Sequence, residues 1–309
     1  MERPGLGADV VVTATTSAFT DRELSPRYRS LRRRRIFASL GTTMTLCCAA
    51  LAAGVLLIIL GYVVVQGARA IDWNFLTQLP HPIGVPGGGV GNGIVCTFII
   101  IGLATAMAVP LGLLTGIYLA LFGRGAIPEG LRFLSDVLSG VPSIAIGLFA
   151  YAVLVAPLKH FSAFSASFAF MMLMLPLLVR TSEQAIRSVP QTVREGALAL
   201  GMSNFRATVY IVLPTAMPAI ITALLLAIAR VVGETAPLLF TAFGSQFWQA
   251  NPNQPMAVLA LQVFSYAISP YPEWQTQAWG GAFLLILAVL ILSLGARLML
   301  RRATRDLDA

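Results

Sequence analysis

The stretch that decides the fold is Gln191–Pro214, which reads QTVREGALALGMSNFRATVYIVLP. Thr192 and Glu195 have the spacing of a capping box, in which each side chain accepts a hydrogen bond from the other residue's backbone N–H. Gly201 is the residue type that commonly ends a helix in the left-handed conformation. These signals predict a helix of about eight or nine residues, roughly 12–14 Å long. Because an isolated helix this short is marginal in water, we expect it to dock on another surface.

The rest of the chain is strongly apolar. Of its 309 residues, 57% are hydrophobic and 11% are charged, whereas a soluble domain carries about 25% charged residues. This composition predicts an all-α integral membrane protein. Apolar runs predict six transmembrane helices, at 42–65, 92–121, 138–157, 162–187, 208–231 and 278–298. We divide the chain into a largely disordered basic segment (1–40), a transmembrane domain (41–300) that contains the loop 188–214, and a short tail (301–309).

The basic residues predict the orientation. The N-terminal segment, the loops 122–137 and 180–206 and the C-terminal end from Arg297 onward hold 18 of the 21 Lys and Arg, whereas the opposite side holds only Arg69 and Lys159. Positively charged flanks stay in the cytoplasm, so we expect a multi-pass protein of the bacterial inner (plasma) membrane with both termini cytoplasmic. The Arg32–Arg35 run is expected to contact anionic membrane lipid. Topology thus explains the net charge of +8, and no nucleic-acid partner is expected.

Three segments are expected to be irregular. A straight helix over 92–121 would be about 44 Å long, so we expect a tilt or a bend at Pro110. The apolar run 209–243 is too long for one span and should break at Gly233 or Pro237. The glycine-rich outer loop 84–93 lacks the Lys-Ser/Thr ending of a phosphate-binding loop, and we interpret it as a flexible linker. A further helix is expected near 256–268.

Two charges fall inside the apolar run, in Ala229–Pro237 (ARVVGETAP). A charge at the middle of a span costs roughly 2.5–3.5 kcal/mol and usually faces a cavity or a partner. Arg230 and Glu234 are four residues apart, so on a continuous helix they share one face. They either neutralise each other, or Arg230 offers its planar donors to an anion that Glu234 positions or releases. The spacing alone leaves both interpretations open.

Two motifs carry a resemblance. The first motif resembles the cytoplasmic EAA loop of ATP-binding-cassette importer permeases. It consists of Glu195-x-Ala197, followed by Gly201 and by Ile211-x-Leu213-Pro214, and it has Gly196 where that family usually has Ala. The 229–238 segment resembles phosphate-importer permease subunits, and so do Val141–Ile144, Leu175–Thr181 and Arg187–Pro190. The likeness extends from about residue 91 to the C-terminus and leaves out the first 40 residues.

This resemblance implies a MetI-like importer permease core of six helices, in which the short helix couples the chain to an ATPase. It implies a permease subunit of a phosphate importer, with a second homologous permease, an ATPase dimer and an extracytoplasmic phosphate-binding protein as partners. The implied ATPase-coupling residues are Glu195, Gly196, Ala197, Gly201, Leu213 and Pro214. The implied substrate-path residues are Arg230, Glu234, Thr235, Arg180 and Ser143. Arg180 has the alternative of snorkelling at the end of its span, and Ser143 that of helix packing.

The sequence contains no nucleotide-binding motif. A P-loop needs Gly-x-x-x-x-Gly-Lys-Ser/Thr, whereas Lys159 is the only lysine and His160 follows it. We therefore expect no catalytic residue, metal or cofactor in this chain, and we expect ATP and Mg to be bound by the partner ATPase.

The runner-up function is a permease for another oxyanion, sulfate or molybdate. An intramembrane enzyme would need a nucleophile and base or a metal cluster, and a passive channel would not need a docking helix.

Overall fold

The computed structural model describes residues 24–82, 85 and 87–305. The parts of the predicted N-terminal segment and tail at 1–23 and 306–309 lie outside the described residues. The chain divides into two compact units, 1–60 and 61–309. The elements are α1 Leu24–Ala70, α2 Trp73–Thr77, α3 Gly91–Leu121, α4 Ala126–Gly140, α5 Ser143–Ala150, the π-helix η1 Tyr151–Val155, α6 Ala156–Leu158, α7 Ala163–Arg187, α8 Gln191–Ala199, α9 Asn204–Ala207, the π-helix η2 Thr208–Val212, α10 Leu213–Val232, α11 Leu238–Thr241, α12 Leu259–Ala267 and α13 Pro272–Arg305. Helix α1 therefore includes residues 24–40, which we expected to be largely disordered.

Five helices in the described part of the chain are long and apolar enough to cross a membrane. They are Phe37–Ala70, Gly91–Leu121, Ala163–Arg187, Asn204–Val232 and Pro272–Met299. The prediction of one helix over 138–157 is wrong, because α4 and the following Ser143–Leu158 segment meet at an angle of 105°. Pro142 has no N–H to continue the α4 ladder, and it forces Val141 into the extended conformation (φ −69°, ψ 130°). This bent pair can form a sixth span.

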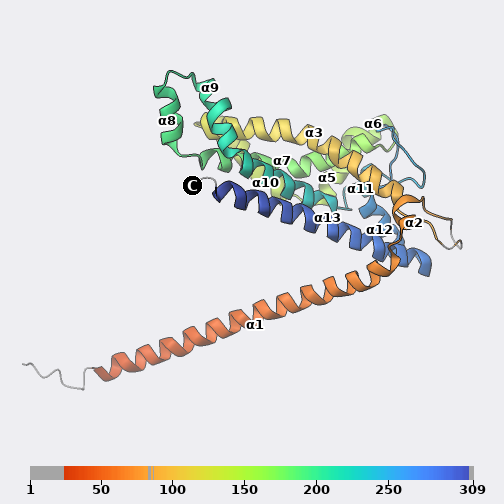
Figure 1. The fold of residues 1–309 in the computed structure, drawn as a ribbon, viewed down its shortest axis with the longest axis horizontal. Helices are drawn as coiled ribbons and strands as arrows, with labels where there is room; N and C mark the ends of the chain where they lie inside the picture. The colour runs from red at the N-terminus through yellow and green to blue at the C-terminus, as the bar shows by residue number, and fades with distance from the viewer. Residues whose placement is uncertain (1–23, 83–84, 86, 306–309) are drawn as a thin grey trace, which may run out of the picture. The chain divides into compact units, whose positions relative to one another are not determined.

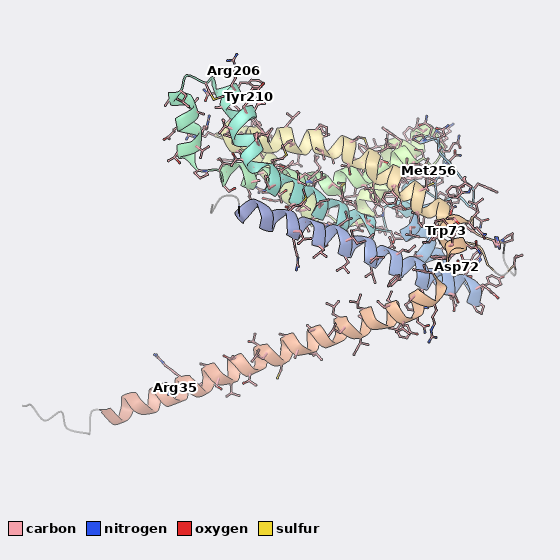
Figure 2. All side chains as sticks on the ribbon, in the orientation of Figure 1. Arg35, Asp72, Trp73, Arg206, Tyr210 and Met256 are labelled. Carbon is pink, nitrogen blue, oxygen red and sulfur yellow. The ribbon has the colours of Figure 1, made fainter. Side chains whose placement is uncertain are left out.

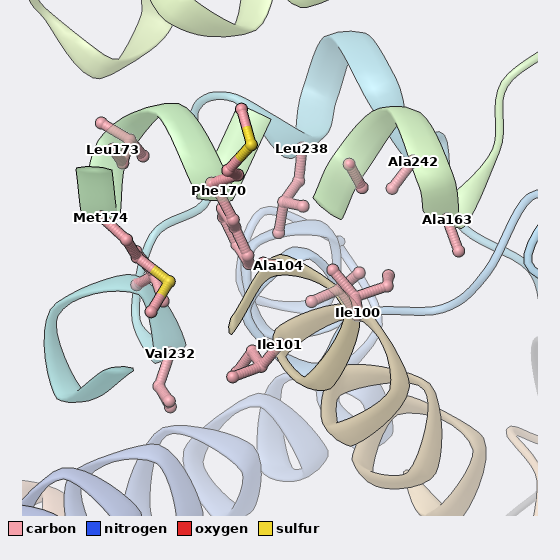
Figure 3. Packing of buried hydrophobic residues seen from close by; sticks show 14 of the residues in the cluster. Ile100, Ile101, Ala104, Ala163, Phe170, Leu173, Met174, Val232, Leu238 and Ala242 are labelled. Atoms are coloured by element: carbon pink, nitrogen blue, oxygen red, sulfur yellow. The ribbon is translucent and has the colours of Figure 1, made fainter. Parts of the chain in front are cut away.

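Helix α7 lies at the centre of the 61–309 unit. It packs against α3, α4, α5 and α10, and α13 covers the other side of α10 (Figure 1). Small residues on α3 allow close approach: a Cβ at Gly112 would lie 2.7 Å from the Leu178 Cβ, and one at Gly116 would lie 2.6 Å from the Ser182 Cβ. Such stripes are typical of helix packing in membranes. Figure 3 shows Phe170 of α7 within the buried hydrophobic core, to which α3 and α10 also contribute side chains.

Backbone chemistry explains the other irregular segments. The predicted break is confirmed, since α10 ends at Val232 and α11 begins after Pro237. Helix α3 continues through Pro110. Each π-helix ends just before a proline, Pro157 or Pro214. Proline lacks the N–H of the regular ladder and its ring crowds the preceding turn, so the wider turn accommodates it.

The glycine-rich loop is packed, and its interpretation as a flexible linker is wrong for residues 88–93, which are buried. A Cβ at Gly89 would lie 2.4 Å from the Phe75 carbonyl oxygen, and one at Gly93 would lie 1.9 Å from Gln262 Oε1. Glycine is required there because α2 and α12 approach the backbone closely. The helix expected near 256–268 is α12, and buried side chains such as Leu259 and Leu261 hold it against the rest of the unit.

Candidate functional site

Two interrupted helices meet inside the 61–309 unit. The α5 helix begins at Ser143, and one turn later Gly147 lies against the start of α11. A Cβ at Gly147 would lie 2.5 Å from the Pro237 Cα, so the two backbones are in direct contact. Ser143 and Gly147 share one face of α5 because they are four residues apart. The bend after α4 and the break after α10 therefore form one junction, and the half-buried Ser143 lies about one turn from it.

Arg230 lies in the last turn of α10 and is exposed on the surface of the chain. Its guanidinium makes no hydrogen bond or ion pair with any residue that the structure describes. Glu234 and Thr235 are half-buried in the break that follows, where the Glu234 N–H donates to the Val231 carbonyl (3.1 Å). The helix has ended before Glu234, so the four-residue spacing does not place the two charges side by side. The described residues accordingly show no ion pair between Arg230 and Glu234.

Arg180 is placed differently, in a network of charges between α4 and α7. Its Nε donates to Asp136 Oδ1 at 2.9 Å, and its Nη2 bonds the other carboxylate oxygen of Asp136. Its Nη1 lies 3.6 Å from Glu183 Oε2. Arg180 is thus already paired within the chain, whereas Arg230 has no such partner among the residues that the structure describes.

Glu183 is the centre of this network, and our sequence reasoning missed it. Its side chain is 5% exposed, and Oε1 accepts a hydrogen bond from Arg132 Nε (2.8 Å) and forms an ion pair with Arg187 Nη2 (2.9 Å). Arg132 also donates to the carbonyl of Leu119 at 3.0 Å, which joins the end of α3 to α4 and α7. Arg180, Glu183 and Arg187 recur at the i, i+3, i+7 spacing of one helix face. That pattern is the signal that could have located it.

The short helix in the deciding stretch is α8. It has nine residues, Gln191–Ala199. The predicted capping box is wrong, because the helix begins one residue earlier than Thr192 and its N-cap is Pro190, with no side-chain hydrogen bond. The Pro190 carbonyl accepts from the Val193 N–H at 3.1 Å and closes the first turn. Thr192 is therefore inside the helix rather than at its cap.

The C-terminus of α8 confirms the role expected for Gly201, whose φ is +84°. The Met202 N–H donates to the Ala197 carbonyl (3.2 Å) and the Gly201 N–H to that of Leu198 (3.0 Å). These two bonds form a Schellman motif, which requires the left-handed residue. The motif fixes the direction in which the chain leaves α8 toward α9.

Helix α8 packs against η2, and Ala197 is buried on α8 while Glu195 and Gly196 are exposed. Leu213 (half-buried) and Pro214 (exposed) directly follow η2 and begin α10. The predicted coupling residues thus surround one elbow, and its exposed face is available to a partner. Figure 2 shows Arg206 and Tyr210 at this end of the unit, opposite Asp72, Trp73 and Met256.

The opposite end carries an uncharged cavity of about 460 Å³, lined by α12 and the 243–247 loop. Tyr266 lines it, and burial raises the pKa of that tyrosine to about 12, so its hydroxyl is neutral at physiological pH. None of the described residues that line it is Asp, Glu, Lys or Arg. This cavity lies in the 244–277 loop region, which is rich in aromatic residues.

Comparison with known proteins identifies relatives. The family described as "Binding-protein-dependent transport system inner membrane component" matches residues 108–307. The phosphate transport system permease protein PstA of Yersinia pestis is 40% identical over 237 residues, which are 76% of this chain and 80% of that protein. PstA of Haemophilus influenzae is 41% identical (78% and 85% covered), and PstA 1 of Mycobacterium tuberculosis H37Rv is 37% identical (88% and 90% covered).

A solved structure has the same fold. An inward-facing conformation of the MetNI methionine ABC transporter aligns with a TM-score of 0.57, covering 69% of this chain and 95% of that chain. The sequence identity is 16%, so the likeness concerns the fold alone. It confirms the expected MetI-like core.

Proposed function

Because this chain belongs to the family of binding-protein-dependent transport system inner membrane components, we propose that it is the permease subunit of an ATP-driven phosphate importer in the bacterial inner membrane. The observation that carries the substrate class is the identity of 40% and 41% to PstA proteins over 76% and 78% of the chain. Arg230, which has no ion-pair partner in the described part of the chain, supports it physically, because a phosphate group is an anion that a guanidinium binds through two parallel hydrogen bonds.

We place the substrate path along the junction of α5 with the α10–α11 break. A partner permease that covers the exposed face of α10 would remove Arg230 from water. No described residue of this chain would then provide an opposite charge. A desolvated, uncompensated cation is unfavourable, so an anion entering between the two permeases would be stabilised there. Thr235 and Ser143 would contribute polar groups beside it. Arg180, which is paired with Asp136, would reach the path only by exchanging that partner.

Glu234 would distinguish phosphate from sulfate. Phosphate keeps at least one proton at neutral pH and can donate a hydrogen bond to a carboxylate, whereas sulfate has no proton and would be repelled. A site that uses a specific hydrogen bond discriminates strongly against a ligand that lacks it. We expect Glu234→Gln to narrow the ratio of phosphate to sulfate uptake, measured in one strain with both labelled ions.

Coupling to the ATPase would run through α8. The exposed face with Glu195 and Gly196 would fit a groove of an ATPase subunit, and the packing of α8 against η2 would pass on its displacement. The span Asn204–Val232 is helical without interruption from α9 through η2 to the last turn of α10, which contains Arg230. Movement of α8 would therefore tilt a rod whose far end carries the proposed anion ligand, a rigid-body switch between inward and outward openings.

The same proposal includes the remaining partners and the orientation. An extracytoplasmic phosphate-binding protein would dock at the end with the uncharged cavity, and both termini and α8 would be cytoplasmic. The arginine-rich character of the α8 end supports this orientation. A second homologous permease and an ATPase dimer would complete the assembly, with anionic lipid around the N-terminal arginines.

The test is uptake of phosphate at low concentration by cells that lack their own high-affinity importer. The cells receive the partner subunits with the wild-type chain, Arg230→Ala, Arg230→Lys or the control Arg297→Ala, which removes an exposed arginine on α13. A charge-assisted hydrogen bond is worth about 1.5–3 kcal/mol, so Arg230→Ala should lower uptake about 10- to 150-fold. Arg230→Lys should retain an intermediate rate, and the control should match the wild type.

Co-purification of the partner subunits must show that each variant assembles. Uptake that survives Arg230→Ala would refute the proposed path. Restoration of sulfate uptake with no change in phosphate uptake would refute the substrate and leave only the importer class. Uptake that persists without the ATPase would favour a passive channel.

A further inference from the structure

A cavity of about 670 Å³ lies at the elbow where α3 and α7 end and α8 begins. It is lined by three arginines, Arg124, Arg187 and Arg194, together with Gln191 in the first turn of α8. None of the described residues that line it is acidic. A smaller neighbouring cavity of about 120 Å³ shares Arg187 and Arg194 and extends between apolar side chains of α7 and η2.

The positive charge in this cavity is only partly compensated within the chain. Arg187 forms an ion pair with Glu183 (Nη2 to Oε1, 2.9 Å) and donates through Nη2 to the Leu119 carbonyl (3.4 Å), but Arg124 has no side-chain hydrogen bond or ion pair with any described residue. Arg194 donates through Nη2 to the amide oxygen of Asn204 (3.2 Å), and its Nε is buried with no hydrogen-bond partner among the described residues. Within the described ranges, the guanidinium groups of Arg124 and Arg194 therefore have no counter-charge, and Arg194 has an unsatisfied buried donor.

The residues around the cavity match the chemistry of a phosphate group. Guanidinium forks bind phosphate oxygens in pairs. The first turn of α8 adds the positive end of a helix dipole, and the first N–H groups of a helix have no partner within it. Two spanning helices end at the cavity rim, so it lies at the level where lipid headgroups meet water.

We propose that this arginine cavity binds a phosphate group, supplied either by inorganic phosphate in solution or by the headgroup of an anionic lipid. The ligand would bridge the end of α3, through Arg124, to the first turns of α8, through Arg194. Bound, it would hold α8 against the ends of the transmembrane helices. The site is separate from the Arg230 junction, and its existence does not depend on which ion the chain transports.

The test measures the reactivity of individual arginines in the assembled transporter, stripped of lipid in detergent. Phenylglyoxal modifies arginine, and mass spectrometry reads the modification of each residue. Four conditions are compared: sodium phosphate, sodium chloride at equal ionic strength, phosphatidylglycerol and phosphatidylcholine. At ten times the dissociation constant, occupancy should slow modification of Arg124 and Arg194 about tenfold. Arg297, exposed on α13 outside the cavity, should be modified equally in all four conditions.

The outcomes separate the two sources. Protection by phosphate alone assigns the free ion, and protection by phosphatidylglycerol alone assigns the lipid. Equal reactivity of Arg124 and Arg194 in all four conditions overturns the proposal. This includes uniformly low reactivity, which would mean that the ATPase already shields both arginines. Arg124→Gln should weaken the protection of Arg194 about tenfold or more, and Arg297→Gln should not. Unchanged protection of Arg194 in Arg124→Gln would also overturn it. Because the readout is protection, failed transport and failed binding are distinguishable.

Discussion

Replacing Glu183 by glutamine tests whether the charge network holds α4 against α7. The substitution keeps the size of the side chain and removes the negative charge that faces three arginines. Removing one partner from a buried ion pair costs about 3–5 kcal/mol. Here the cost should be smaller. Arg132 would still donate a hydrogen bond to the Leu119 carbonyl (3.0 Å), and Arg187, whose side chain is 52% exposed, would still be hydrated. We expect a loss of about 2–3 kcal/mol in the free energy of unfolding.

The assay is thermal unfolding of the purified transporter, followed by exposure of buried cysteine. Each kcal/mol lowers the melting temperature by about 2–4 °C for domains of 150–250 residues, so Glu183→Gln should melt about 4–12 °C below the wild type. Glu129→Gln is the matched control, since Glu129 is exposed on α4. If the two variants melt within about 2 °C of each other, the network does not stabilise the fold. A double-mutant cycle with Arg132→Gln then measures the pair directly.

The other predictions concern glycines. Gly147→Ala should lower the free energy of unfolding by about 1–3 kcal/mol and reduce phosphate uptake, because the new Cβ would lie 2.5 Å from the Pro237 backbone. Gly140→Ala is the control: its Cβ would meet nothing within 4 Å, so stability and uptake should stay unchanged. Gly201→Ala should cost about 1–2 kcal/mol because of its positive φ, and Gly196→Ala should gain about 1 kcal/mol. Thermal unfolding checks both pairs, and the opposite order within either pair would refute the reasoning.

The elements that the sequence predicted correctly depend on local backbone chemistry. Gly201 ends α8 in the left-handed conformation because few other residues adopt it, and this requires no knowledge of the rest of the fold. The break between Gly233 and Pro237 follows in the same way from residues that cannot continue a helix. The capping box failed because Pro190, two residues before Thr192, is the N-cap and closes the first turn.

The elements that were missed depend on distant parts of the chain. Hydropathy alone made 138–157 look like one span, since the apolar residues of α4 face outward and merge with the run that follows Pro142. Arg132 is separated from Glu183 by 51 residues, so the local charge pattern of α7 could have located Glu183 but not its contact with α4. Arg230 was recognised as unusual, but only the structure showed that α10 ends at Val232, before Glu234, so that the two residues do not share a helix face.

The charge network also has a consequence for biosynthesis. Arg132 and Asp136 precede their partners on α7 by 51 and 44 residues. At a synthesis rate of about 5–20 residues per second, they leave the ribosome roughly 2–10 s before Glu183 and Arg180. Throughout that interval α4 carries unpaired charges on one face and apolar residues on the other, which suits the membrane surface rather than its interior. Helix α4 should therefore reach its final place only after α7 has been inserted, which makes the order of translation part of the folding route.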